Sequence, residues 1–225
     1  MIRAFRARRF TGMGSATLKA LRDLDAGGSW AISGARGEMA AGNGGAMRIA
    51  PLAFVVDLHT ERQLVRDIVR ITHANDEAYA GALAVLVAIQ DRGQATLPAF
   101  LAHVCDELPD SVTRDRLRDV ASLPEDTPIE GVAARLGSSG YVAETVPLAL
   151  FAGYKMAAGQ FEAGLEEIVK VAEDADTIAS ISGQVAGVRL GLSGLPNALL
   201  DTIPEHSLIE ELGRAFARAV GEKWG

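Results

Sequence analysis

Two aspartates and a threonine stand close together in the stretch EDADTIASISGQVAG. Asp174, Asp176 and Thr177 offer two carboxylates and a hydroxyl, which are hard oxygen ligands that suit Mg²⁺ or Mn²⁺ better than a soft metal. Residues two apart on a regular helix point about 200° away from each other, so we expect both aspartates to lie in the turn before a helix. The alternative is an ordinary helix N-cap, where Asp and Thr are common.

The residues after this motif predict a helix in the middle of the fold. Its buried stripe is expected to comprise Ile178, Ile181, Val185, Val188 and Leu192. The small residues that are expected to let neighbouring helices approach closely are Ala179, Ser182, Gly183, Ala186 and Gly187. Two carboxylates at the buried end of such a helix repel each other unless a cation or several donors satisfy them, which favours a metal site.

A glycine-rich stretch, AGNGGAMRIAPLAF, offers a second kind of chemistry. Gly42, Gly44 and Gly45 surround Asn43 and would let the backbone curl its N–H groups toward an anion. The following residues, Ala46, Met47 and Arg48, would begin a helical turn whose positive end faces the same point. The stretch thus predicts a cradle for a phosphate or diphosphate, against the alternative of a flexible connection.

Three further side chains are candidates for ligand contacts. His73 precedes a predicted helix and would donate to a ligand oxygen, unless it is a surface capping residue. Tyr141 follows the glycine-containing sequence GSSG and would stack on a base, unless it is a half-buried aromatic. Glu144 is either an acid of the site or a charge in the first turn of a helix.

Composition limits the partners and the compartment. The 225 residues carry a net charge of -7, which argues against a nucleic-acid surface. A single cysteine, Cys105, excludes an internal disulfide and fits a reducing compartment. The longest apolar stretch, AGALAVLVAIQ, is too short to span a bilayer. The basic opening MIRAFRARRF is followed by no apolar signal core, so we expect a cytoplasmic protein that binds no membrane.

Helical periodicity runs through the apolar segments, and no convincing strand pattern interrupts it. Capping residues are expected at Asn75, at Thr60 with Gln63 in a capping box, and at Thr127 before Pro128. The pattern predicts an all-α, single-domain, compact multi-helix fold over residues 1–225. Helices are expected over 15–25, 60–72, 76–90, 97–108, 110–121, 128–136, 142–156, 161–172, 177–192 and 206–220, with a glycine-rich loop over 33–45.

Taken in order, GNGGAMRIAPLAF, ITHANDEAYAGA, GSSGYVAETVPLALFA and DADTIASISGQVAG resemble the successive motifs of the ADP-ribosylglycohydrolase family. Four spaced motifs in the right order are far more specific than any one of them. The resemblance implies an all-helical hydrolase that removes ADP-ribose from a modified protein or small molecule, using a pair of Mg²⁺ or Mn²⁺ ions. The partner it implies is ADP-ribose or an ADP-ribosylated molecule, and we expect a monomer.

The same resemblance assigns roles to particular residues. Asp174, Asp176 and Thr177 match the family's C-terminal metal ligands, and the loop from Gly42 to Arg48 matches the part that wraps the diphosphate and ribose. His73 matches a ligand-contacting histidine, and Tyr141 matches an aromatic residue near the adenine. The catalytic residues are left unassigned.

Two departures from the family pattern affect the expected activity. Glu173 stands where family members usually have glycine, which alters the turn or adds a charge near the ions. The motifs that supply the other half of the family's metal site have no match, so the sequence resembles the C-terminal portion of the family domain. We therefore expect an impaired hydrolase; the alternatives are an inactive ADP-ribose-binding module and a structural remnant with neither property.

Overall fold

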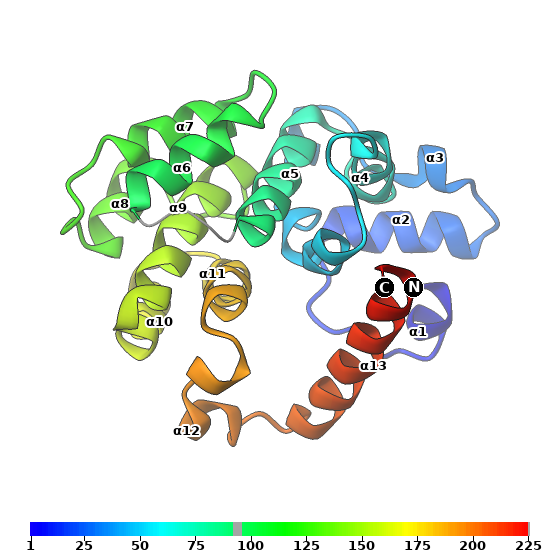
Figure 1. The fold of residues 1–225 in the computed structure, drawn as a ribbon. Coiled ribbons are helices and arrows are strands. Elements are labelled where there is room, and N and C mark those ends of the chain that lie inside the picture. Colours follow the sequence, from blue (N-terminus) through cyan, green and yellow to red (C-terminus); the bar gives the residue numbers. More distant parts are fainter. Residues whose placement is uncertain (92–95, 225) are drawn as a thin grey trace.

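The computed structural model describes residues 1–91 and 96–224 and is built from helices (Figure 1). The described residues form no strand, and the pairs Ala35–His73 and Gly42–Tyr141 make isolated bridges. The expectation of an all-α fold is thereby confirmed. The α-helices are α1 (Ile2–Arg6), α2 (Ser15–Asp25), α3 (Trp30–Ser33), α4 (Arg62–Arg70), α5 (Asp76–Gln90), α6 (Leu97–Asp106), α7 (Val112–Ala121), α8 (Ile129–Leu136), α9 (Val142–Lys155), α10 (Phe161–Val171), α11 (Ala175–Leu190), α12 (Asn197–Leu200) and α13 (His206–Trp224).

Helix α9 lies at the centre of the core and packs against α5, α7, α8 and α11. Its apolar residues are buried nearly all round, as in a helix that neighbours surround on every side. Pro147 lies inside it and has no N–H to donate to the carbonyl of Ala143 four residues earlier. Arg116 of α7 donates to that carbonyl at 3.2 Å, so a side chain supplies the hydrogen bond that proline removes.

Helices α9 and α11 approach each other closely at Gly153 and Ser182. A Cβ atom added to Gly153 would lie 2.8 Å from the Ser182 carbonyl oxygen, and the Ser182 hydroxyl donates to the Ala149 carbonyl of α9 at 3.1 Å. The prediction that Gly183 and Gly187 let a neighbouring helix approach closely was wrong, because an added Cβ would meet nothing within 4 Å at either position. The small residue that permits the contact belongs to the partner helix instead.

The buried stripe of α11 is shorter than the sequence predicted. Ile178, Ile181 and Val185 are buried, but Val188 is half-buried and Leu192 is 57% exposed in the short 3-10 turn Leu192–Gly194. Gly191, with φ +66°, ends the helix before Leu192, so the helical periodicity no longer holds at that residue.

The expected caps are confirmed in part. The Asn75 side chain accepts from the Ala78 N–H at 3.0 Å and caps α5. The capping box at Thr60 was wrong, because α4 begins at Arg62 and the Thr60 hydroxyl donates to Asp57 at 3.0 Å. The N-cap residue of α8 is Pro128 rather than Thr127, and the proline side chain cannot accept a hydrogen bond from the first turn.

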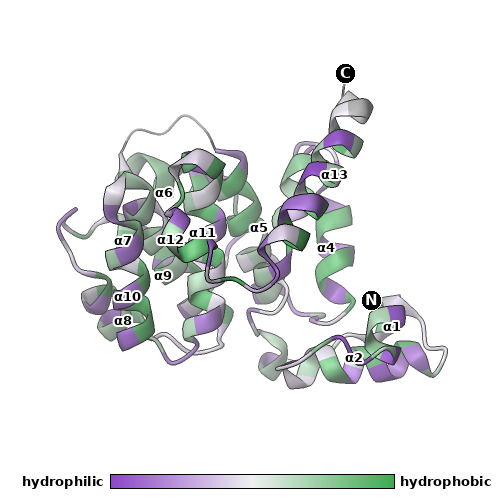
Figure 2. Ribbon diagram, turned by 90° about the horizontal axis from the view of Figure 1, so that it is seen from below, coloured by the Kyte–Doolittle hydropathy of each residue, from purple (hydrophilic) through white to green (hydrophobic). Residues whose placement is uncertain are grey.

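The terminal elements are more exposed than the central helices. Figure 2 shows mixed hydrophilic and hydrophobic residues along α13, in contrast to the mostly hydrophobic α5. Phe216 of α13 meets Phe54 edge to face, with ring centroids 6.2 Å apart. No helix in the described part of the chain has the length and apolar character that crossing a bilayer requires.

Candidate functional site

One cavity of about 390 Å³ brings together stretches that lie far apart in the sequence. Eight of its lining residues are sequence-predicted site residues: Gly42, Asn43, Gly44, Met47, His73, Asp174, Asp176 and Thr177. The others are Gly12, Gly14, Ser15, Ala16, Thr17, Met39 and Gly140. The predicted metal ligands and the glycine-rich loop therefore share one concave surface.

The backbone at the start of α11 explains how both aspartates face this cavity. Asp174 is the N-cap residue, with φ -105° and ψ 60°, and α11 begins at Ala175. Asp176 and Thr177 belong to its first turn, so the expectation that both aspartates precede the helix was right only for Asp174. The non-helical backbone of Asp174 removes the 200° separation that a continuous helix would impose.

Asp174 is held by a chain of hydrogen bonds. The Asn43 side-chain amide donates to Asp174 Oδ2 at 2.6 Å and to the Thr145 hydroxyl at 2.8 Å. Thr145 in turn donates to the Ser139 carbonyl at 2.7 Å, and the Asp174 N–H donates to the Ser138 carbonyl at 3.0 Å. Through Asn43 these bonds fix Oδ2 of Asp174, and the other carboxylate oxygen is free of Asn43.

The electrostatics of this group favour an ionised carboxylate at Asp174. Burial acts to raise the pKa of Asp174, but the hydrogen bond from Asn43 and the nearby polar groups of Asp176 and Thr177 outweigh burial and lower its pKa below the ordinary value. Its side chain makes no capping bond, and the Thr177 N–H donates instead to Asp176 at 2.9 Å. The arrangement differs from an ordinary N-cap, in which the cap residue's own oxygen accepts the first-turn N–H.

Glycines are needed in the Gly42–Gly45 loop because other groups come close, and not because of backbone conformation. A Cβ atom on Gly44 would lie 2.8 Å from His73 Cε1, and one on Gly42 would lie 3.2 Å from His73 Nε2. Gly45 approaches Val69 of α4 in the same way, at 3.0 Å. None of the three has a positive φ, so the expected unusual backbone freedom was wrong at these positions.

His73 lies against this loop and is 5% exposed, so it is not a surface capping residue. Its Nδ1 is 2.7 Å from the Thr72 hydroxyl, and its backbone bridges Ala35. Burial and the nearby positive charge of Arg48 lower the pKa of His73 to about 4. The imidazole is therefore neutral at neutral pH.

Arg48 and Gly45 lie outside the lining of the cavity, although the sequence placed them in the loop that wraps the ligand. The Arg48 guanidinium donates to the Gly44 carbonyl, to the Thr72 hydroxyl at 2.7 Å and to the Ile68 carbonyl at 3.3 Å. Burial lowers the pKa of Arg48 to about 10, which leaves it charged at neutral pH. Its contacts join the glycine-rich loop to the C-terminal end of α4.

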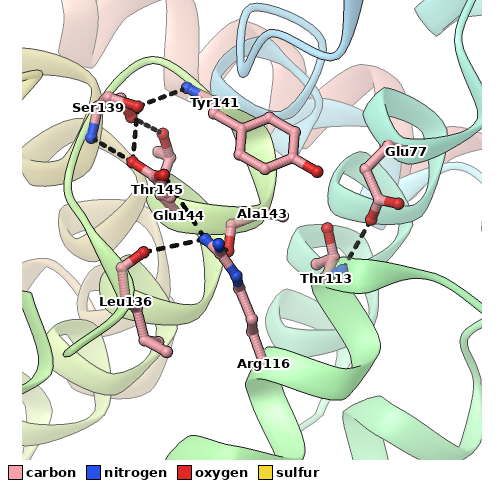
Figure 3. A network of polar contacts seen from close by, with 9 residues as sticks. All are labelled: Glu77, Thr113, Arg116, Leu136, Ser139, Tyr141, Ala143, Glu144 and Thr145. Atoms are coloured by element: carbon pink, nitrogen blue, oxygen red, sulfur yellow. Dashed lines mark hydrogen bonds and ion pairs between the residues drawn. The ribbon is translucent and has the colours of Figure 1, made fainter. Parts of the chain in front are cut away.

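Tyr141 and Glu144 also lie outside the lining of this cavity. Figure 3 shows Tyr141 beside Arg116, whose guanidinium carbon is 5.6 Å from the ring centroid. The Glu144 carboxylate accepts from the Ser139 N–H at 3.1 Å and from the Ser139 hydroxyl at 2.6 Å. These contacts hold the 137–141 turn in place. This turn contains Gly140, which lies next to Asp174, so Glu144 supports the cavity without lining it.

Sequence reasoning missed the start of α2 as part of the cavity. Its first turn comprises Ser15, Ala16 and Thr17. The N-cap residue Gly14 has no side chain that could accept a hydrogen bond from the N–H groups of this turn. A glycine-flanked helix N-terminus presents N–H groups and a partial positive charge, which favour an anion. The signal was present as T-G-M-G-S before a periodic helix. Glu173, the departure from the family pattern, is exposed and does not line the cavity.

Comparison with known proteins identifies the family of this chain. The family model described as ADP-ribosylglycohydrolase matches residues 2–224. The chain belongs to the ADP-ribosylglycohydrolase family. It is 29% identical over 207 residues to an uncharacterized protein of Archaeoglobus fulgidus, covering 89% of this chain and 65% of that protein. To human ADP-ribosylhydrolase ARH3 it is 25% identical over 214 residues, covering 79% of this chain and 59% of ARH3.

A solved structure titled "ADP-ribosylglycohydrolase-related protein complex" has the same fold. The TM-score is 0.71 at 28% sequence identity, over 96% of this chain and 71% of that chain. The suspected family resemblance is confirmed by these matches. The chain spans less than two thirds of the length of the curated relatives just named.

Proposed function

We propose that this chain is an ADP-ribosyl hydrolase, which cleaves the glycosidic bond between ADP-ribose and a modified protein or small molecule. The observation that carries the proposal is the shared cavity of Asp174, Asp176 and Thr177 with the Gly42–Met47 loop, in a chain of the ADP-ribosylglycohydrolase family. The name of the human relative, ADP-ribosylhydrolase, supports the same reaction class.

The proposed metal is Mg²⁺ or Mn²⁺, held by Asp174, Asp176 and Thr177. These oxygen donors fit a hard cation in kind, and Asp174 keeps one carboxylate oxygen free of Asn43. In number they fall short, since the described residues contain no group of three or more His, Cys, Asp or Glu side chains that could hold a metal ion. When bound, the cation would orient oxygen atoms of the substrate and lower the pKa of a bound water that attacks the glycosidic carbon.

The remaining parts of the cavity suit the anionic portion of ADP-ribose. His73 and the first turn of α2 offer neutral N–H donors to the cavity that the carboxylates also line, and such donors bind diphosphate without adding charge. Tyr141 stays the proposed aromatic residue for the adenine, although it lies outside the lining of the cavity. ADP-ribose or an ADP-ribosylated molecule is the proposed partner of a cytoplasmic monomer.

We further propose that turnover by these 225 residues is slow while binding is retained. Ground-state binding requires the loop, His73 and the helix N-terminus, all of which are in the chain. Turnover requires positioned charge at the ribose, and loss of one such group lowers rates by about 10²–10³-fold. The alternative function is an inactive ADP-ribose-binding module, for which the small metal-ligand set is the supporting observation.

A release assay separates the two functions. Free ADP-ribose is measured after incubation of the chain with ADP-ribosylated arginine and with an ADP-ribosylated protein, in Mg²⁺ and in Mn²⁺. Slow release that Asp174→Asn abolishes supports the hydrolase. Binding of ADP-ribose without release above the Asp174→Asn background identifies the binding module, and absence of both contradicts the proposal.

A further inference from the structure

Three side chains form a continuous polar series that ends at His73, which lines the cavity. The Arg48 guanidinium lies 2.7 Å from the Thr72 hydroxyl, which lies 2.7 Å from His73 Nδ1. Thr72 is fully buried and His73 is nearly so. Arg48 ends the 3-10 turn Ala46–Arg48 that follows the glycine-rich loop, whereas Thr72 and His73 are consecutive residues just after α4.

The direction of each hydrogen bond follows from what each group has to offer. A guanidinium has donors only, so Thr72 accepts from Arg48. The hydroxyl has one proton left to give, and the partner that the structure offers it is His73 Nδ1. A neutral imidazole that accepts at Nδ1 carries its proton on Nε2.

The Nε2 side of the ring faces the glycine-rich loop. Nε2 lies 3.2 Å from where a Cβ of Gly42 would be and 3.3 Å from where a Cβ of Gly44 would be, and His73 lines the cavity. We propose that Thr72, oriented by Arg48, is a positioning residue that locks His73 as the neutral Nε2–H tautomer, so that His73 donates to an anionic ligand oxygen in the cavity.

The hydrogen bond from Thr72 makes His73 a neutral donor with a fixed direction instead of a cation. A second positive charge beside Arg48 would be unfavourable in a buried position, which agrees with the lowered pKa of His73. A side chain at Gly42 or Gly44 would press against the edge of the ring, with its Cβ 3.2 Å from Nε2 or 2.8 Å from Cε1. The identity of the ligand as ADP-ribose rests on the proposed function, whereas the tautomer is a property of the ligand-free chain.

The tautomer is measured by ¹⁵N NMR on the histidine-labelled, ligand-free chain at neutral pH. The chain has four histidines, and the variant His73→Gln identifies the signals of His73. We expect a protonated-nitrogen shift at Nε2 and an unprotonated one at Nδ1. A proton on Nδ1, or an imidazolium at neutral pH, overturns the inference without any test of ADP-ribose binding.

The role of Thr72 is tested by Thr72→Val, which removes the hydroxyl at nearly constant shape, and by Thr72→Ser, which keeps it. Thr113→Val is the matched control, because Thr113 is a fully buried threonine whose hydroxyl has no hydrogen-bond partner. We expect a mixture of His73 tautomers in Thr72→Val and the parent tautomer in Thr72→Ser and Thr113→Val. An unmixed parent tautomer in Thr72→Val contradicts the role of Thr72.

Calorimetry with ADP-ribose then measures the consequence for binding. A lost or misdirected hydrogen bond lowers affinity about three- to tenfold. We expect that loss in Thr72→Val, recovery in Thr72→Ser and no change in Thr113→Val. Equal affinity of Thr72→Val and the parent overturns the inference, while failure of the parent to bind ADP-ribose contradicts the proposed function and leaves the NMR result to decide the tautomer.

Discussion

Acidification should destabilise the fold through His73. In the folded chain burial and Arg48 lower the pKa of His73 to about 4, from an ordinary value of 6.5. The unfolded chain therefore binds the proton more tightly, and the stabilisation is fully present above about pH 6.5 and is lost as the pH falls toward about 4. Linkage across this window gives a loss of about 2 kcal/mol between about pH 7 and about pH 5.

Urea denaturation at the two pH values measures this loss, with His73→Gln as the control. Gln keeps a polar side chain but does not titrate, so the difference between parent and variant cancels the titration of carboxylates elsewhere. We expect the free energy of unfolding to fall about 2 kcal/mol further in the parent than in the variant. Equal falls in the two proteins would refute the buried, neutral histidine and the lowered pKa behind it.

Four substitutions test the packing and the loop. Gly153→Ala should lower the free energy of unfolding by about 1–3 kcal/mol, because the added Cβ meets the Ser182 backbone. Gly183→Ala adds its Cβ in open space and should raise the free energy of unfolding by about 0.5–1 kcal/mol. Urea titrations in which both substitutions shift stability in the same direction would contradict this. Arg116→Met should lower the free energy of unfolding by about 1–3 kcal/mol, since the Ala143 carbonyl loses its donor, and an unchanged urea midpoint would argue otherwise. Gly44→Ala should displace His73 and weaken ADP-ribose binding about tenfold in calorimetry, and parent-like affinity would count against the site.

Much of the fold follows from local sequence rules. The bounds of α2 and α5 were predicted to the residue, because each has a continuous apolar period and a clear terminating signal. A boundary was predicted wrongly where another local contact took the place of the expected cap, as at Thr60, whose hydroxyl donates to Asp57 three residues earlier and does not cap α4. The replacement of the Pro147 hydrogen bond by Arg116 depends on packing between helices, which no local pattern encodes.

For the candidate site, sequence motifs named most of the cavity wall but not the reasons for its shape. Glycines in the 42–45 loop signalled unusual backbone, whereas the structure requires them for the approach of His73 and Val69. Arg48, Tyr141 and Glu144 belong to the right segments, yet they turn toward neighbouring helices and turns. Side-chain direction depends on contacts distant in sequence, so motif spacing did not separate cavity residues from the supports behind them.

The central claim, that one cavity of this chain binds ADP-ribose, is tested most directly by titration calorimetry of the 225-residue chain with ADP-ribose in excess Mg²⁺ at neutral pH. The glycine-rich loop, His73 and the start of α2 line that cavity together with Asp174. We expect a saturable heat with one ligand bound per chain. No heat of binding from a chain whose folding is verified by far-UV dichroism would contradict it.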